Sequence, residues 1–179
     1  MKLICATKAD FSTILKLIEE AKYNMKQMGV TQWTKDYPNE EVIRADIERQ
    51  EMLKGVNSLG EIVCVGTLSK LPFNQKENLI FRHDDYFIKR LVSIPGSKGY
   101  AQRWVTQCLV NHPAGALQDS GKLYTMTNHS NLRMQALLEK IGFYKVAQQI
   151  VEDREDFGPF YIYTQSIRHM KRMTKDGNK

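Results

Sequence analysis

The chain has 179 residues, of which 42% are hydrophobic and 26% charged, a balance typical of a single soluble globular domain. No apolar run approaches the roughly 20 residues that span a bilayer, and no secretory signal opens the chain, so we expect a cytoplasmic protein. The net charge of +6 comes mostly from the last twelve residues, which carry five Lys or Arg against one Asp, so the body has no basic groove and we expect no nucleic-acid or membrane partner.

The first third of the chain predicts one strand and two helices. Residues 2–6 form a short apolar run that is typical of a strand. Thr7 and Asp10 have the spacing of a capping box, and apolar residues with helical period follow it. Asn39 precedes a second helix, which we expect over residues 40–53.

The middle of the chain predicts a hairpin and a further strand. Two β-rich runs within residues 55–71 are joined by a Gly-containing turn at 58–61. Residues 72–85 are a mostly polar connection, with a short strand expected at 78–81. The run over 86–94 is again dense in residues that favour strands.

The last part of the chain predicts two helices and three strands. A helix begins after Gly99, a strand covers 122–127, and a second helix covers 131–141 with Gly142 at its left-handed end. Residues 143–151 and 160–167 form a strand pair. We therefore expect one domain over residues 1–167 and a basic, frayed tail over 168–179.

The stretch "LVSIPGSKGYA", residues 91–101, is a turn from a strand into a helix. The first amides of a helix have no partner within it, so they form a ready anion site. Gly96 and Gly99 let the backbone approach a phosphate, and Lys98 adds a positive charge. The spacing matches neither a P-loop nor a Rossmann motif, and a purely structural turn stays open as the alternative.

Three segments, in order, resemble the GNAT superfamily of N-acetyltransferases over residues 3–166. The opening 6–21 looks like its first strand and helix, "RLVSIPGSKGYA" is similar to its signature after the fourth strand, and "NHSNLRMQALLEKIGF" is similar to its other recurrent segment. The resemblance implies an α/β fold of the α+β type, in which about four helices flank a mixed, mostly antiparallel sheet of six or seven strands. It also implies that this sheet is splayed near its fourth and fifth strands to hold acetyl-CoA.

The resemblance further implies where the substrates bind. Acetyl-CoA would contact the turn and the neighbouring strand and helix, through Leu91, Val92, Ser93, Gly96, Ser97, Lys98, Gly99, Tyr100, Ala101 and Asn131. Asn131 also fits a helix N-cap, and the two roles are compatible. The amine acceptor would lie against Gln32, Trp33 and Tyr37, although these side chains can equally fold back on the core. A homodimer is implied by analogy alone.

Two departures leave the catalytic group unassigned. Gly96 stands where the family usually has Gln or Arg, and Leu138 stands where many members have a tyrosine that protonates the departing thiolate. Tyr124 and His129 are weak candidates for a substitute acid, and Asp85 is a weak candidate for the base. His129 also fits a simple loop residue, and Asp85 also fits a solvated strand end. The three cysteines lack ligand spacing, so we expect no metal.

The sequence thus favours an acetyl-CoA-dependent N-acetyltransferase that acts by direct transfer on a primary amine of a small molecule or peptide. A CoA-binding module with little catalytic activity is the alternative, on the strength of Leu138 and Gly96. The hypothesis of a nucleic-acid-associated protein depends only on the basic tail. Transfer of acyl groups longer than acetyl also stays open as an alternative.

Overall fold

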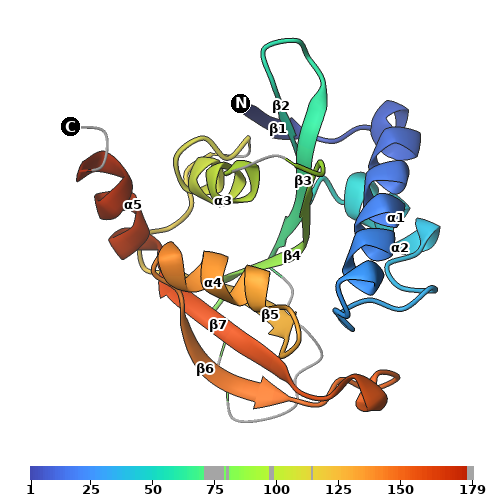
Figure 1. The fold of residues 1–179 in the computed structure, drawn as a ribbon. Coiled ribbons are helices and arrows are strands. Elements are labelled where there is room, and N and C mark those ends of the chain that lie inside the picture. The colour runs from blue at the N-terminus through green and yellow to red at the C-terminus, as the bar shows by residue number, and fades with distance from the viewer. Residues whose placement is uncertain (71–78, 80, 97–98, 114, 177–179) are drawn as a thin grey trace.

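A computed structural model describes residues 1–70, 79, 81–96, 99–113 and 115–176. Within these residues, seven strands form one sheet in the order β1-β2-β3-β4-β5-β7-β6 (Figure 1). The strands are β1 (Lys2–Cys5), β2 (Met52–Val56), β3 (Ile62–Ser69), β4 (Tyr86–Ser93), β5 (Lys122–Asn128), β6 (Tyr144–Gln149) and β7 (Phe160–Ser166). Every neighbouring pair is antiparallel except β4 and β5, so the sheet is mixed and mostly antiparallel, as predicted.

Helices cover both faces of this sheet (Figure 1). They are α1 (Phe11–Gln27), α2 (Glu40–Glu48), α3 (Tyr100–Val110), α4 (Leu132–Lys140) and α5 (Ile167–Asp176). One core holds Ile14 of α1 and Ile43 of α2 against Val65 of β3. The other core holds Trp104 of α3 and Leu138 of α4, and both side chains are fully buried. The helices pack on the sheet in these cores, because each helix has an apolar stripe that it buries there.

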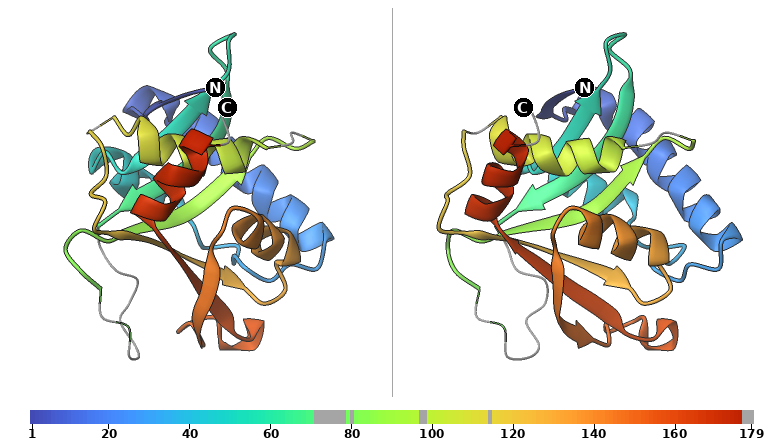
Figure 2. Two further views of the ribbon diagram at one scale, coloured as in Figure 1. Left: turned by 90° about the vertical axis from the view of Figure 1, so that its left-hand side faces the viewer. Right: turned by 60° about the vertical axis from the view of Figure 1, so that its left-hand side comes forward.

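The sheet divides between β4 and β5. These parallel strands pair only along Tyr86–Ile88 and Leu123–Thr125, and Figure 2 shows them diverging beyond that point. β5 stays paired with β7 along its whole length, whereas β4 follows β3. The pairing of β3 with β4 shifts register where Arg90 has a φ of +53°, which is the mark of a β-bulge. The splay that the resemblance implied is therefore present.

Two predicted boundaries were wrong. The second helix ends at Glu48 instead of 53, because Gln50 takes a φ of +57° and Met52 already belongs to β2. The tail is not frayed from residue 168, because α5 runs to Asp176 and buries Met170 to 4% exposure beside α3. Of the strand expected at 78–81, the structure describes only residues 79 and 81.

The remaining local predictions agree with the structure. Asp10 accepts hydrogen bonds from the backbone N–H and the hydroxyl of Thr7, both at 2.8 Å, at the start of α1. Gly142 ends α4 with a φ of +91°. None of the helices in the described ranges combines the length and the apolar composition that crossing a bilayer requires.

Candidate active site

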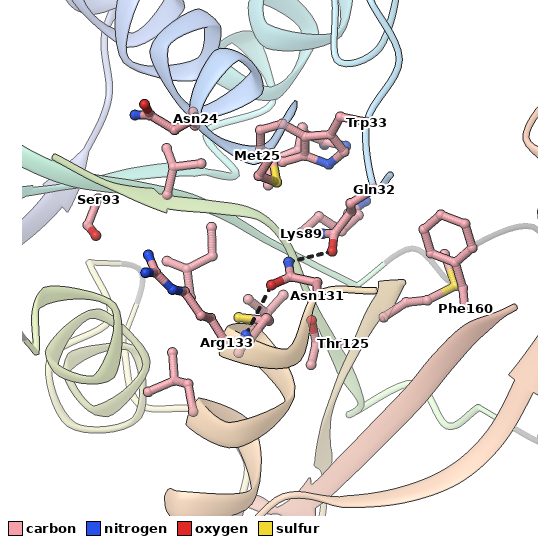
Figure 3. Close-up of a pocket in the computed structure, with 18 of the residues that line it drawn as sticks. Asn24, Met25, Gln32, Trp33, Lys89, Ser93, Thr125, Asn131, Arg133 and Phe160 are labelled. Atoms are coloured by element: carbon pink, nitrogen blue, oxygen red, sulfur yellow. Dashed lines mark hydrogen bonds between the residues drawn. The ribbon is translucent and has the colours of Figure 1, made fainter. Parts of the chain in front are cut away.

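A cavity of about 310 Å³ opens where β4 and β5 separate (Figure 3). Its walls come from the C-terminal half of α1, from the loop that holds Gln32, Trp33 and Tyr37, from β4, and from the first turns of α4. Four segments far apart in the sequence therefore meet here. The cavity lies where a divided sheet leaves strand edges without a neighbouring strand, so backbone groups are within reach of a ligand.

Four of the ten predicted cofactor residues line the cavity. Leu91, Val92 and Ser93 come from β4, and Asn131 stands in front of α4. Figure 3 shows Ser93 at one side of the cavity and Asn131 near its middle. Beyond the bulge at Arg90, Val92 and Ser93 pair with β3 again, whereas the pairing of β4 with β5 ends at Ile88. The other edge of this segment therefore faces the place where the sheet divides.

Four other predicted cofactor residues, Gly96, Gly99, Tyr100 and Ala101, lie just before and at the start of α3. Gly96 has a φ of +71°, and Gly99 occupies the N-cap of α3 with a φ of +85° and no side-chain cap. Tyr100 and Ala101 form the first helical turn. The helical ladder begins with the Arg103 N–H donating to the Gly99 carbonyl at 2.9 Å, so the amides before it point out of the helix end. Ser97 and Lys98 lie outside the described residues.

The turn has room for an anion. A Cβ built on Gly96 or Gly99 meets no described heavy atom within 4 Å, so the backbone is open on that side. Free amides at a helix N-terminus and an unobstructed approach are what a diphosphate needs. The residues present therefore fit the phosphate end of a CoA thioester.

Gln32 and Asn131 are brought together at the middle of the cavity. The Gln32 Oε1 atom accepts hydrogen bonds from the Asn131 Nδ2 atom and from the Thr127 hydroxyl, each at 2.7 Å. The Asn131 Oδ1 atom accepts from the Met134 N–H at 3.1 Å, so Asn131 caps α4. The side-chain carbonyl of Gln32 thus connects the loop after α1 to the start of α4 through hydrogen bonds.

A buried ion-pair network holds Tyr37. Asp46 of α2 is fully buried and accepts hydrogen bonds from the Arg90 Nε atom at 2.7 Å and from the Thr67 hydroxyl at 2.6 Å. Arg49 donates to the other carboxylate oxygen at 2.7 Å. Arg90 in turn donates to the Tyr37 hydroxyl at 2.9 Å. The network holds one cavity wall in place, and no local sequence pattern predicts it.

Arg154, from the loop before β7, is a further lining residue that the sequence did not single out. Its guanidinium lies 4.7 Å from the centre of the Tyr37 ring and 5.2 Å from that of Phe160. It donates to the Gln32 carbonyl at 3.3 Å. Burial lowers the pKa of this guanidinium from its ordinary value. The side chain is thus a partly desolvated cation held between aromatic rings.

Comparisons with known proteins show which fold this geometry belongs to. No family model and no curated protein matches the sequence. Solved structures do: a GNAT-family acetyltransferase from Streptococcus agalactiae has a TM-score of 0.72 at 19% identity, with 92% of this chain and 94% of that chain covered. The chain has the GNAT acetyltransferase fold.

Two further structures with this fold carry named activities. A ribosomal-protein-alanine N-acetyltransferase from Brucella melitensis has a TM-score of 0.66 at 13% identity over 93% of this chain and 99% of that one. A chimera of spermidine N-acetyltransferase from Vibrio cholerae has a TM-score of 0.67 at 14% identity, over 94% and 96%. The two proteins are named for different acceptors, so the GNAT fold leaves the acceptor open.

The three weak catalytic candidates do not line the cavity of this GNAT fold. Tyr124 is 5% exposed and stacks on Phe87 with ring centroids 5.4 Å apart, and burial raises the pKa of its hydroxyl. Asp85 is 1% exposed and accepts from the backbone N–H groups of Arg82 at 2.9 Å and Lys122 at 2.8 Å. His129 is exposed in the loop before α4.

The described lining residues include no Asp, Glu, His or Cys. Leu138, which replaces the tyrosine common in GNAT proteins, is fully buried in the core and lines no part of the cavity. Elsewhere in the described ranges, no three His, Cys, Asp or Glu side chains are grouped so that they could hold a metal ion. The site therefore offers backbone amides, neutral polar groups and cations.

Proposed function

We propose that this chain is an acetyl-CoA-dependent N-acetyltransferase that acts by direct transfer on a primary amine of a small molecule or peptide. The observation that carries the proposal is the division of the sheet at β4 and β5, which opens onto a cavity beside a glycine turn at a helix N-terminus. The GNAT fold supports the same reaction class. When bound, acetyl-CoA would supply the acetyl group as an activated thioester.

Under this proposal, two sets of backbone amides bind different parts of acetyl-CoA. The amides that open α3, with Gly96 and Gly99 leaving space, would hold the diphosphate. The backbone N–H groups of Leu91–Ser93 would bind the pantetheine arm and polarise the acetyl carbonyl. Asn131 has a second amide hydrogen beyond the one given to Gln32, and this hydrogen can reach the arm.

Direct transfer agrees with the positions of the cysteines. Cys64 and Cys108 are fully buried in the core, and burial raises the pKa of both thiols, so neither is a nucleophile. Cys5 lies on β1, at the far edge of the sheet. The acceptor amine itself is then the attacking group.

Positioning supplies most of the acceleration under this proposal. Good orientation of two bound reactants contributes about 7–11 kcal/mol, whereas a proton-transfer side chain contributes typically 10²- to 10⁴-fold in rate. The described lining residues include no carboxylate or imidazole, so the amine proton would leave to water. The same feature favours the second candidate, a CoA-binding module with little catalysis.

Two measurements test the proposal. Acetyl-CoA and CoA should each raise the melting temperature, whereas ATP and NAD should not. At a ligand concentration of 100 times Kd, binding adds about 2.7 kcal/mol to the free energy of unfolding. Incubation with acetyl-CoA and a panel of amines should release free thiol only when an acceptor is present. A thermal shift without acceptor-dependent release would favour the binding module, and no shift would refute both functions. A cytoplasmic location and a homodimer stay predictions.

A further inference from the structure

The charges around the cavity are all of one sign. Four cationic side chains line it, Lys89, Arg90, Arg133 and Arg154, and the described lining residues include no Asp or Glu. An amine acceptor is itself a cation in water, so a site for a simple amine or a polyamine would be expected to carry carboxylates. The observed lining opposes such a ligand.

Arg90 is the one member of this set whose charge is compensated. Asp46 binds it through a hydrogen-bonded ion pair, and both side chains are almost completely buried. For Lys89, Arg133 and Arg154 there is no ion pair with any described residue. Asp46 and Glu51 act on Lys89, and Asp153 acts on Arg154, only from beyond ion-pair distance. The three cations thus keep donors for an anionic ligand.

Arg154 is built to receive an anion. The rings of Tyr37 and Phe160 hold its guanidinium at 4.7 and 5.2 Å, and only one of its N–H groups is used within the described residues, in the bond to the Gln32 carbonyl. A guanidinium has five N–H donors in a rigid fork that matches a carboxylate or a phosphate. Its partial burial strengthens any charge pair that forms there.

Lys89 is a second cation that has no ion pair with a described residue. It lies on β4, is half-buried, and makes no hydrogen bond with a described residue. Burial and the neighbouring Arg90 lower the pKa of its ammonium, and they outweigh the opposite effect of Asp46 and Glu51. A ligand carboxylate or phosphate would supply a counter-ion.

These two cations lie at the end of the cavity that faces away from the phosphate turn. Lys89 precedes Ser93 by four residues, which spans about 13 Å along a strand, and the turn follows Ser93. Figure 3 likewise shows Ser93 and Phe160 on opposite sides of the cavity. Arg133 is exposed and comes from α4. Arg154 and Lys89 are thus placed for the acceptor rather than for the phosphates of CoA.

We propose that the acceptor is a small molecule carrying both its amine and an anionic group, a carboxylate or a phosphate, and that Arg154 and Lys89 bind this anionic group. The inference rests on the proposed function and narrows its substrate class. It also separates this chain from the spermidine N-acetyltransferase that shares its fold, because a polyamine would meet only like charges here.

Matched ligands test the charge preference by direct binding. Calorimetric titrations compare 4-aminobutyrate, butylamine and 1,4-diaminobutane, which differ only in the group at the far end, and O-phosphoethanolamine against ethanolamine. We expect at least tenfold tighter binding of each ligand that carries an anionic group than of its match without one, and the weakest binding for the diamine. The stronger of the two anionic ligands decides between carboxylate and phosphate. Equal affinities, or tightest binding of the diamine, would overturn the proposal.

Variants test the two residues. Arg154→Gln and Lys89→Met should each weaken binding of the preferred anion at least fivefold while leaving the Kd of CoA within twofold. Arg44→Gln is the matched control, because its guanidinium also lies over an aromatic ring, 3.7 Å from the centre of Phe11, but outside the cavity. Arg154→Lys keeps the positive charge but lacks the forked guanidinium. It serves as a second variant at this position in case Arg154→Gln does not fold. Loss of CoA binding in Arg154→Gln would mean that the residue serves the cofactor, and the proposal would fall.

The titrations are run with and without CoA, so the two proposals fail in different ways. A wild-type protein that prefers anionic ligands but binds no CoA would contradict the proposed function alone. A protein that binds CoA and shows no preference for anionic amines would contradict the acceptor assignment alone.

Discussion

The turn before α3 and the opposite end of the cavity present different chemical groups. At the turn, the backbone end, these groups are helix amides beside two glycines of positive φ, and no described side chain caps the helix. At the other end, Tyr37, Arg90 and Arg154 are held by an ion pair and by ring contacts. A site made of backbone suits a ligand common to many proteins with one fold, whereas a site made of side chains can change its specificity without changing the fold.

The largest expected effect concerns the side-chain end. Asp46→Ala would leave Arg90 buried without its carboxylate, so the free energy of unfolding should fall by about 3–5 kcal/mol, measured by urea denaturation. Glu48→Ala is the control, because Glu48 is exposed and its ion pair with Lys8 is a surface pair worth at most about 1 kcal/mol. A similar small loss in both variants would show that the ion pair does not hold this wall.

The backbone end is tested by Gln102→Glu. Gln102 is the third residue of α3, a position from which a Glu side chain reaches back to the N-cap amide, so it would compete with a phosphate for the same donors. We expect about tenfold weaker acetyl-CoA binding by calorimetry, equivalent to about 1.4 kcal/mol, with no loss of stability.

A matched variant controls for the added charge. Gln107→Glu places the same side chain later on α3, away from the helix N-terminus, and should leave the Kd of acetyl-CoA unchanged. Equal weakening in both variants would point to general charge repulsion, and the comparison between the two ends would lose its basis.

Asn131 lies where the two ends meet, and two substitutions separate its roles. Asn131→Ala removes the α4 cap and the bond to Gln32 and should cost about 1 kcal/mol of stability. Asn131→Ser keeps a capping oxygen and should recover most of that loss. If Asn131 also touches the pantetheine arm, both variants raise KM for acetyl-CoA alike. A KM that follows stability instead would reduce the residue to a helix cap.

The smallest effect is a pH dependence outside the cavity. Burial alone would raise the pKa of Asp10, but hydrogen bonds from Lys54 and Thr7 outweigh it and lower that pKa. The stabilisation is thus complete above the unfolded pKa near 4 and is lost as pH falls through the folded value. Asp10→Asn should cost below about 1 kcal/mol at pH 7 and less at pH 2.5, measured by urea unfolding. An unchanged pH dependence would contradict this role.

The sequence predicted what depends on neighbouring residues. The glycine turn, the hairpin at 58–61 and the cap at Asn131 are local, so composition and spacing reveal them. The contact of Arg90 with Asp46 joins residues 44 apart, and that of Arg154 with Gln32 joins residues 122 apart. No local pattern encodes such contacts, so the acceptor end was only partly foreseen.

One missed element did have a local signal. Ile167 and Met170 stand three residues apart, which is helical spacing, and both are buried in α5. The surrounding charges favour a solvated tail if composition alone is considered. The charges instead occupy the outer face of an amphipathic helix.

The short pairing between β4 and β5 also bears on solubility. Two strands with unpaired edges in the middle of a sheet would ordinarily invite pairing with another chain and lead to aggregation. Here α1 and α4 flank the gap, so an extended ligand arm can enter where a foreign strand cannot. The opening proposed to admit a thioester is thereby shielded from self-association, and a bound arm would add to that protection.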